Sequence, residues 1–273
     1  MIAERMSLKG KVAIITGGGS GLGKATALKM AKAGADIIAV GRRPAPLEKT
    51  VGEVKALGRQ ALAIPTDATI SGDVDTMVDR VHEAFGRLDI LANFAGGGRA
   101  GGGKPLLQIT DEEWHYGIDI NLTTAFMCAR SVARYMIPAG KGTIILISSG
   151  WGLRGGKKNL IYCAAKGGVI NLTRALAASL AGDGINVNCV APGLVPTPER
   201  IAEMPETVAA WKSRLQYFPL RRLGVPDDIA LAATFLATDA ANYMNGETVL
   251  VDGGALAGGY APYSYQHNVE FAT

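Results

Sequence analysis

The fold is decided by the octapeptide Thr16-Gly17-Gly18-Gly19-Ser20-Gly21-Leu22-Gly23. It joins an apolar, β-branched run at 12–16 to a stretch of helical periodicity at 22–33, which stops at Gly34. Between a strand and a helix, glycines permit a tight turn, and the first amides of the helix can bind a pyrophosphate. A glycine-rich turn without a ligand is the plainer alternative, and the spacing differs from the usual G-x-G-x-x-G. We expect phosphate binding by Gly17, Gly19, Ser20, Gly21, Leu22 and Gly23.

The same alternation of short apolar runs and helical stretches continues along the chain. Further strands are predicted at 36–40, 61–65, 89–93, 143–148, 186–191 and 249–252, with long amphipathic helices around 111–137 and 159–181. This pattern predicts an α/β fold with a doubly wound, Rossmann-type parallel sheet that helices cover on both faces. No linker or repeat is visible, so residues 1–273 are expected to form a single domain. The Pro-, Glu- and Arg-rich segment 197–225 is predicted to form a helical flap over the carboxyl edge of the sheet, and 255–273 a C-terminal tail.

Composition excludes several classes of protein. The net charge is +4 and no long basic run is present, so a nucleic-acid partner is not expected. No run reaches the roughly 18 apolar residues that would cross a membrane, and the polar start is not a signal peptide. Cys128, Cys163 and Cys189 lack metal-type spacing and are expected to be reduced, buried thiols of a cytoplasmic protein without a metal site.

A pair of residues in the second long helix suggests proton-transfer chemistry. Tyr162 and Lys166 are four positions apart and therefore share one face of a helix. A free phenol has a pKa near 10, and a nearby ammonium favours the phenolate, which could exchange a proton with an alcohol or a ketone. An ordinary amphipathic helix is the alternative. Ser149 ends the preceding apolar strand, where its hydroxyl could donate to a substrate oxygen or, as Ser148 equally could, cap the strand.

The phosphate turn resembles the T-G-x-x-x-G-x-G motif of the short-chain dehydrogenase/reductase family, and later motifs extend the resemblance from about Leu8 to Gly254. Asn93-Phe94-Ala95-Gly96 is similar to the family's N-N-A-G segment, with Phe94 replacing the second Asn. The resemblance implies that Asn121 holds a water beside the Lys, and that the catalytic set is Asn121, Ser149, Tyr162 and Lys166. It implies that Asp67 contacts adenine and that the Pro192-Gly193 segment with Thr197 frames the nicotinamide. The further coenzyme contacts expected are Asp67, Ala68, Asn93, Ala95, Gly96, Tyr162, Lys166, Pro192, Gly193, Val195 and Thr197.

The residues after the second strand bear on the choice of dinucleotide. An acid there would bond the ribose hydroxyls of NAD and repel the 2′-phosphate of NADP. This chain has Gly41 instead, followed by Arg42 and Arg43, and a guanidinium can bind a phosphate through two hydrogen bonds. NADP(H) is therefore favoured, with NAD(H) left open. The alternative is that both arginines are solvated loop residues.

Three features suggest where a substrate could bind. Trp151 and Arg154 follow Ser149 closely and are expected to border the reacting carbon, with Arg154 binding an acidic or polar group. The glycine-rich loop 96–104 offers Arg99 or Lys104 to an anion, or is a mobile surface loop. The tail is expected to pack on its own domain or on a neighbouring subunit, through Tyr260, Tyr263, Tyr265, His267 and Phe271.

The function predicted is an NAD(P)(H)-dependent oxidoreductase that interconverts a secondary alcohol and a ketone on a small-molecule substrate. Two alternatives remain. One is a 3-oxoacyl-thioester reductase, which would need a basic surface for a carrier protein; Arg130, Arg134 and Arg174 are available. The other is a regulatory protein that binds a dinucleotide without turnover. The resemblance also implies a homotetramer built through the two long helices and the C-terminal strand region.

Overall fold

A computed structural model describes the chain except residues 1, 98–102, 158, 214, 216–217 and 259–273. Within the described part, a parallel sheet of seven strands forms the centre, in the order β3-β2-β1-β4-β5-β6-β7. The predicted doubly wound α/β fold is confirmed. The strands are β1 (Val12–Thr16), β2 (Asp36–Gly41), β3 (Ala61–Pro65), β4 (Ile90–Asn93), β5 (Gly142–Ile147), β6 (Ile185–Pro192) and β7 (Thr248–Val251).

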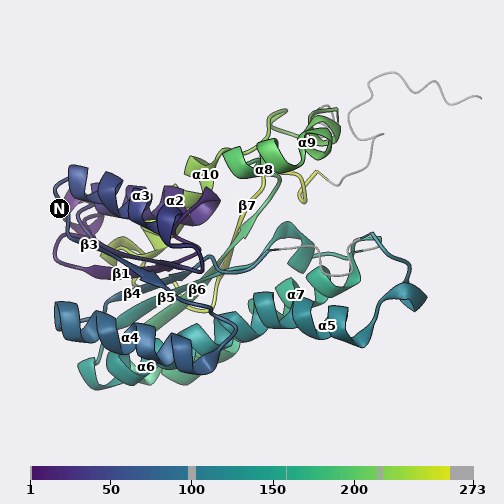
Figure 1. Cartoon of the computed structure of the whole chain (residues 1–273). Coiled ribbons are helices and arrows are strands. Elements are labelled where there is room, and N and C mark those ends of the chain that lie inside the picture. Colours follow the sequence, from purple (N-terminus) through teal and green to yellow (C-terminus); the bar gives the residue numbers. More distant parts are fainter. Residues whose placement is uncertain (1, 98–102, 158, 214, 216–217, 259–273) are drawn as a thin grey trace, which may run out of the picture.

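Helices cover both faces of this sheet (Figure 1). One layer contains α2 (Gly21–Lys32), α3 (Pro44–Ala56) and α10 (Pro226–Leu236), and the other contains α4 (Ser71–Phe85), α6 (Thr124–Ala139) and α7 (Leu160–Leu180). A cluster of buried apolar side chains fills the space between the sheet and each layer. Because both faces of β1 are covered, all five of its residues are buried, which explains its uninterrupted apolar sequence.

The strand order reverses beside β1. Strands β2 and β3 lie on one side of it, and β4 to β7 lie on the other. The connections after β1 and β4 therefore diverge to opposite faces, which opens a crevice at the carboxyl ends of these two strands, at Thr16 and Asn93. This is the position in which doubly wound proteins bind their ligands.

The long helix expected around 111–137 is interrupted. It consists of α5 (Asp111–Ile118), a π-helical turn over Asp119–Thr123, and α6. The wider turn inserts one residue into the helical ladder, and such insertions are often found at functional sites. Asn121 lies in this turn and is buried.

Two short helices, α8 (Pro198–Glu203) and α9 (Pro205–Lys212), form within the segment expected to be a flap. They stand above the carboxyl end of the sheet, apart from the two helical layers (Figure 1). A four-residue helix, α1 (Ile2–Arg5), lies at the N-terminal end. None of the described helices is long and apolar enough to cross a bilayer.

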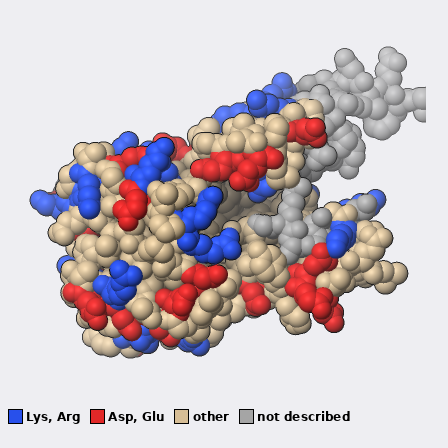
Figure 2. All heavy atoms as spheres, viewed as in Figure 1, with Lys and Arg blue, Asp and Glu red and all other residues tan. Residues whose placement is uncertain are grey.

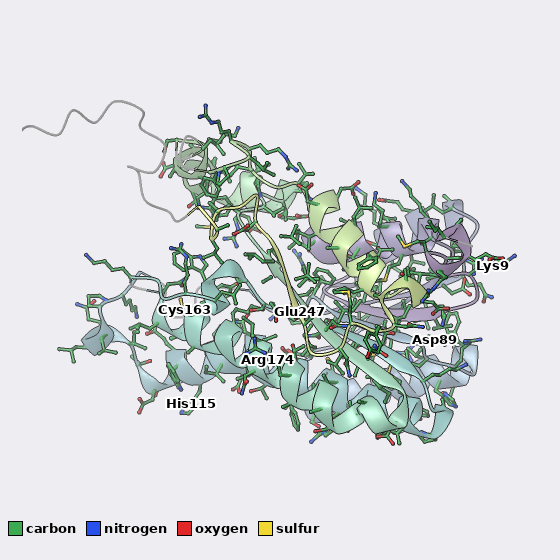
Figure 3. All side chains as sticks on the ribbon, turned by 180° about the vertical axis from the view of Figure 1, so that it is seen from behind. Lys9, Asp89, His115, Cys163, Arg174 and Glu247 are labelled. Atoms are coloured by element: carbon green, nitrogen blue, oxygen red, sulfur yellow. The ribbon has the colours of Figure 1, made fainter. Side chains whose placement is uncertain are left out.

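The cysteines are free thiols, but the prediction that all are buried is wrong for one of them. Cys128 and Cys189 are buried, whereas Cys163 is half-buried in the first turn of α7 (Figure 3). Its neighbours explain the difference, because the side of α7 that carries Cys163 and the exposed Ala164 does not face the sheet.

Candidate functional site

A cavity of about 970 Å³ lies at the carboxyl edge of the sheet. It runs from the ends of β1 and β2 to the start of α7, and the flap residues Thr197, Arg200 and Trp211 line it from above. Figure 2 shows the corresponding hollow, with Lys and Arg side chains at its edge. The predicted residues that line it are Gly17, Gly19, Ser20, Gly21, Leu22, Gly23, Arg42, Arg43, Asp67, Ala68, Ala95, Gly96, Ser149, Trp151, Tyr162, Lys166, Pro192, Gly193, Val195 and Thr197.

The phosphate turn is too tightly packed to carry side chains. A Cβ at Gly17, whose φ is +67°, would lie 3.0 Å from the carbonyl carbon and oxygen of Phe94. A Cβ at Gly23 would overlap the carbonyl oxygen of Gly17. The turn thus leaves backbone amides, rather than side chains, facing the cavity, as a bound pyrophosphate requires.

Asn93 holds this turn from below rather than lining the cavity. The hydroxyl of Thr16 donates to Oδ1 of Asn93 (2.8 Å) and accepts from the amide of Ala95 (2.9 Å). The Asn93 side chain is 2 % exposed. Its contact therefore fixes β1 to the segment after β4, and Asn93 is not among the residues that line the cavity.

A carboxylate already lies at the first amide of α2. The Gly21 N–H donates to Oε1 of Glu199, which belongs to α8 of the flap (3.4 Å). Burial opposes the ionisation of Glu199, but hydrogen bonds from its own amide, the Thr197 hydroxyl and the Gly21 amide keep its pKa below the ordinary value. The N-terminal end of α2 thus binds an anionic oxygen through a donated N–H, which fits the predicted binding of phosphate.

The part of the cavity next to the ends of β2 and β3 fits an adenosine moiety. Asp67 accepts hydrogen bonds from the Thr69 hydroxyl (2.7 Å) and amide (3.0 Å), which together with the nearby Arg42 charge hold its pKa below the usual range. Arg42 and Arg43 are exposed and line the rim. At Gly41 an added Cβ would meet only Leu47 Cδ2 at 3.6 Å, so neighbouring atoms leave room for a side chain there.

Three of the predicted catalytic side chains line the part of the cavity between the end of β5 and the start of α7. Ser149 follows β5, and its Oγ accepts from the amide of Trp151 (3.2 Å), which leaves the hydroxyl proton free to point toward Tyr162. Lys166 is 4 % exposed and its Nζ donates to the carbonyl of Ile147 (2.8 Å). This Nζ lies 5.8 Å from the centroid of the Tyr162 ring.

The expected lowering of the Tyr162 pKa by Lys166 is wrong for the protein's own groups. Burial raises the pKa of Tyr162, and the Ser149 hydroxyl and the Arg200 charge offset this only in part. Burial also lowers the pKa of Lys166 to about 8, so the ammonium is itself disfavoured. The sequence shows that the two residues share a helical face, but it does not show how deeply that face is buried.

Asn121 lies behind the cavity wall. Its Oδ1 accepts from the amide of Gly97 (2.9 Å), and its Nδ2 donates to the carbonyl of Gly117 (3.0 Å). A Cβ added to Gly96 would lie 3.0 Å from Asn121 Oδ1 and 3.5 Å from Lys166 Nζ. Gly96 therefore keeps a gap between the amide and the ammonium that a side chain would fill.

Two side chains considered for contact with the substrate do not line the cavity. The guanidinium of Arg154 stacks on the Trp151 ring, 4.0 Å from its centroid, and is not among the residues that line the cavity. Lys104 pairs with Glu113 of α5 (2.5 Å) and does not line the cavity either. Arg99 and the aromatic residues of the tail beyond 258 lie outside the described residues.

The lining residues that the sequence analysis did not predict come from the segment 197–225 and from the segment before α7. Lys157, Arg200 and Trp211 line the cavity. A signal existed for Arg200, because it follows the predicted coenzyme residue Thr197 by three positions, which is nearly one helical turn. Lys157 and Trp211 lie in stretches whose sequence does not indicate which way they face.

Comparisons with known proteins agree with this geometry. Residues 17–255 match a family model described as enoyl-(acyl carrier protein) reductase. The chain is 40 % identical, over 91 % of its length and 98 % of the relative's, to the (2S)-[(R)-hydroxy(phenyl)methyl]succinyl-CoA dehydrogenase subunit BbsD of Thauera aromatica. It is 38 % identical to a 3-oxoacyl-[acyl-carrier-protein] reductase of Synechocystis, over 92 % and 98 % of the two chains. A solved structure from Agrobacterium tumefaciens, assigned as a 2-deoxy-D-gluconate 3-dehydrogenase with bound NADP, aligns with a TM-score of 0.82 and 35 % identity over 93 % and 99 % of the two chains.

Proposed function

Because the chain belongs to the short-chain dehydrogenase/reductase family, whose members act on CH–OH and carbonyl groups, we propose that it interconverts a secondary alcohol and a ketone with NADP(H), using Tyr162 as the acid and base. One observation carries this proposal. The cavity that holds the phosphate turn at one end holds Ser149, Tyr162 and Lys166 at the other. A dinucleotide whose pyrophosphate binds at α2 would extend its nicotinamide toward these three residues.

In the direction of reduction, Tyr162 acts as the acid. Its raised pKa keeps the phenol protonated near neutral pH, so that it can give its proton to the ketone oxygen as negative charge develops there. The Ser149 hydroxyl, whose oxygen is already held by the Trp151 amide, donates a hydrogen bond to the same oxygen. The coenzyme, when bound, supplies the hydride, and its oxidised ring supplies a positive charge.

In the direction of oxidation, Tyr162 must take the proton from the alcohol. Lys166 supports the phenolate by its charge and through the proton that it can pass onward. It is fixed for this role by its hydrogen bond to the Ile147 carbonyl. The gap at Gly96 connects the ammonium to Asn121, which fits the family's arrangement of a relay through a water.

NADP(H) is supported as the coenzyme by the end of β2. Gly41 brings no carboxylate to repel a 2′-phosphate, and Arg42 and Arg43 line the same part of the cavity. Among the predicted coenzyme residues, the glycines of the turn, Asp67 and the segment from Pro192 to Thr197 would hold the remainder of the molecule.

Reduction of a 3-oxoacyl thioester is the second candidate, since the Synechocystis relative carries that name. A carrier protein would need a basic surface beside the cavity, and the arginines considered for that surface support this candidate less than the first one. Arg134 is paired with Asp79 (2.8 Å) and Arg130 donates to Ser71 (2.7 Å), so both are held by their own chain. All three arginines are exposed, and Arg174 lies on α7 (Figure 3).

A panel of substrates tests the proposal. The protein is mixed with NADPH or NADH and a set of small ketones, polar keto acids and 3-oxoacyl thioesters, and the absorbance of the reduced coenzyme is followed. We expect oxidation of NADPH with one of the small ketones or keto acids, and faster than with the thioesters. Preference for the thioesters would favour the second candidate, and no oxidation with any compound would contradict both.

A homotetramer is part of the same proposal. The family's assembly uses the two long helices and the C-terminal strand region, which correspond here to α6, α7 and β7. Its support is the side chain of Phe126 on α6, which is 43 % exposed despite being a large apolar residue.

A further inference from the structure

The charges that line the cavity are unevenly distributed. Among the described residues that line the cavity, Asp67 is the one acidic residue. It lies beside the expected adenosine site and accepts a hydrogen bond from the Thr69 hydroxyl. Arg42 and Arg43 lie at the same end and are accounted for by the coenzyme. Besides Lys166 of the proposed catalytic set, the cations Lys157 and Arg200 line the cavity, and no carboxylate other than that of Asp67 lines it in the part of the chain that is described.

Arg200 is held in place but not neutralised. Its amide donates to Oγ1 of Thr197 (3.2 Å), which caps the start of α8, and its Nη1 contacts Sδ of Met204 (3.1 Å). No carboxylate of the described residues lies within 4.0 Å of its guanidinium, whereas Lys24, Lys104 and Arg222 each pair with an acid. A guanidinium that faces a cavity without a counter-ion favours an anionic ligand there.

The position of Arg200 relates this anion to the reacting carbon. Arg200 and Tyr162 line the same cavity, and Arg200 follows the capping residue Thr197 at the start of α8, in the segment that is expected to frame the nicotinamide. Trp151 and Trp211 also line the cavity and add apolar surface to it. The space therefore suits a compact molecule with a hydrophobic body and one acidic group near its carbonyl.

We propose that the substrate of the reaction above is a hydroxy acid or keto acid, whose carboxylate binds the guanidinium of Arg200 while its alcohol or ketone oxygen faces Tyr162 and Ser149. This inference rests on the proposed function, since it names the substrate class of the same site. Lys157, which is exposed, adds a second positive charge to the lining of the cavity. The phosphates of an acyl-coenzyme A lie at the far end of its pantetheine arm from the thioester, so they cannot reach a cation that lies beside Tyr162.

Matched substrates and variants test the carboxylate subsite. The panel consists of 4-oxocyclohexanecarboxylate and 4-oxopentanoate, each with its methyl ester, and 3-oxobutanoyl-coenzyme A. The variants are Arg200→Met and, as a matched control on the neighbouring helix, Lys212→Met, which removes an exposed cation outside the cavity. The ratio of kcat/KM for acid over ester is the readout, because loss of Arg200 also changes the field at Tyr162 and slows both substrates alike.

We expect the unmodified protein to prefer an acid over its ester by about tenfold or more, in line with a charge-assisted hydrogen-bonded pair. Arg200→Met should reduce that ratio at least tenfold, Arg200→Lys should retain part of it, and Lys212→Met should leave it unchanged. An equal loss on acid and ester would overturn the subsite while leaving the reaction intact. A loss confined to the coenzyme A thioester would show that the anion is a phosphate and would also overturn it.

A binding measurement separates this inference from the proposed function. The tryptophan fluorescence, to which Trp114, Trp151 and Trp211 all contribute, is followed while 4-oxocyclohexanecarboxylate or its ester is added to the protein with NADP⁺ present, so that no reduction occurs. Saturable quenching by the acid, at least tenfold weaker in Arg200→Met, supports the subsite even if no compound is turned over. Equal quenching by acid and ester contradicts it. Melting temperatures and NADPH affinity of each variant show that the fold is retained.

Discussion

At the scale of single residues, burial determines the state of the proton-transferring pair. Tyr162 has a raised pKa and Lys166 a lowered one, and in both cases burial is the largest cause. Both residues are therefore displaced toward their neutral forms, and the ionised pair expected from their spacing alone is not the resting arrangement. A neutral phenol suits the donation of a proton to a ketone, and its ionisation depends on added positive charge.

Removing the phenol hydroxyl should abolish turnover while sparing the fold. In Tyr162→Phe we expect kcat to fall by roughly 10²–10⁴, the range that a positioned general acid contributes. NADPH affinity and melting temperature should stay close to those of the parent. Tyr135→Phe is the control, because Tyr135 donates to Asp79 outside the cavity. Retention of activity in Tyr162→Phe would refute its role as acid and base.

Lys166 should make stability depend on pH above neutrality. Its pKa falls from 10.5 in the unfolded chain to about 8 in the folded protein. Below pH 8 the buried ammonium destabilises the folded state fully. Above pH 8 the folded state loses its proton first, so the free energy of unfolding rises with pH until the unfolded chain also titrates near 10.5.

The isosteric variant Lys166→Met removes this titration. We expect the difference in unfolding free energy between parent and variant to shift in favour of the parent by about 3 kcal/mol between pH 8 and 10.5. The lost hydrogen bond to the Ile147 carbonyl adds an offset that does not vary with pH. Urea unfolding at several pH values measures the slope, and parallel curves for the two proteins would count against a lowered pKa.

The sequence predicted the chemical identity of the site better than its substrate contacts. Ser149, Tyr162 and Lys166 could be found because strand ends and helical spacing determine where such side chains meet. Arg154 was misplaced because nearness to Ser149 in sequence does not determine direction. The short 3₁₀ turn at Gly150–Gly152 reverses the chain, and the guanidinium stacks on the Trp151 ring.

At the scale of elements, apolar runs predicted every strand to within one or two residues. Parallel strands covered on both faces require such runs, so their pattern is unambiguous. The π-helical turn at Asp119–Thr123 could not be predicted, because it alters hydrogen-bond spacing without a distinct residue pattern. For α8, six residues are too few for a periodicity to define its faces, and only the spacing of Arg200 from Thr197 indicated its direction.

The last residue of β2 should control the choice of coenzyme. Gly41→Asp places a carboxylate where a 2′-phosphate would bind, and the nearest atom to its Cβ lies at an ordinary contact distance of 3.6 Å. We expect kcat/KM for NADPH, relative to NADH, to fall at least tenfold through charge repulsion and competition for Arg42. Gly41→Asn, which has the same shape without the charge, should change the ratio far less. If both variants behave alike, the preference does not arise at this position.

At the scale of the whole molecule, association should depend on the outer face of α6. Phe126 is 43 % exposed, and the Arg130 guanidinium lies 5.4 Å from its ring centroid. Light scattering of the parent should give four chains of 28.4 kDa. Phe126→Glu should give smaller particles, because a charge in an apolar interface is costly. Leu57→Glu changes a residue of similar exposure (40 %) at the end of α3 and should leave the mass unchanged. A monomeric parent would contradict the tetramer.

The hydrogen bond between Glu199 and Gly21 has a consequence for the order in which the two ligands bind. Two anions cannot share one amide, so a diphosphate that arrives at α2 has to displace this carboxylate. Arg200 is the next residue of the same short helix. We expect that displacement of Glu199 by the coenzyme changes the position of α8 and therefore of Arg200, so that the hydroxy acid binds best after the dinucleotide. Initial-rate kinetics of the compulsory-order type, with the dinucleotide first on and last off, would follow from this competition for the Gly21 amide.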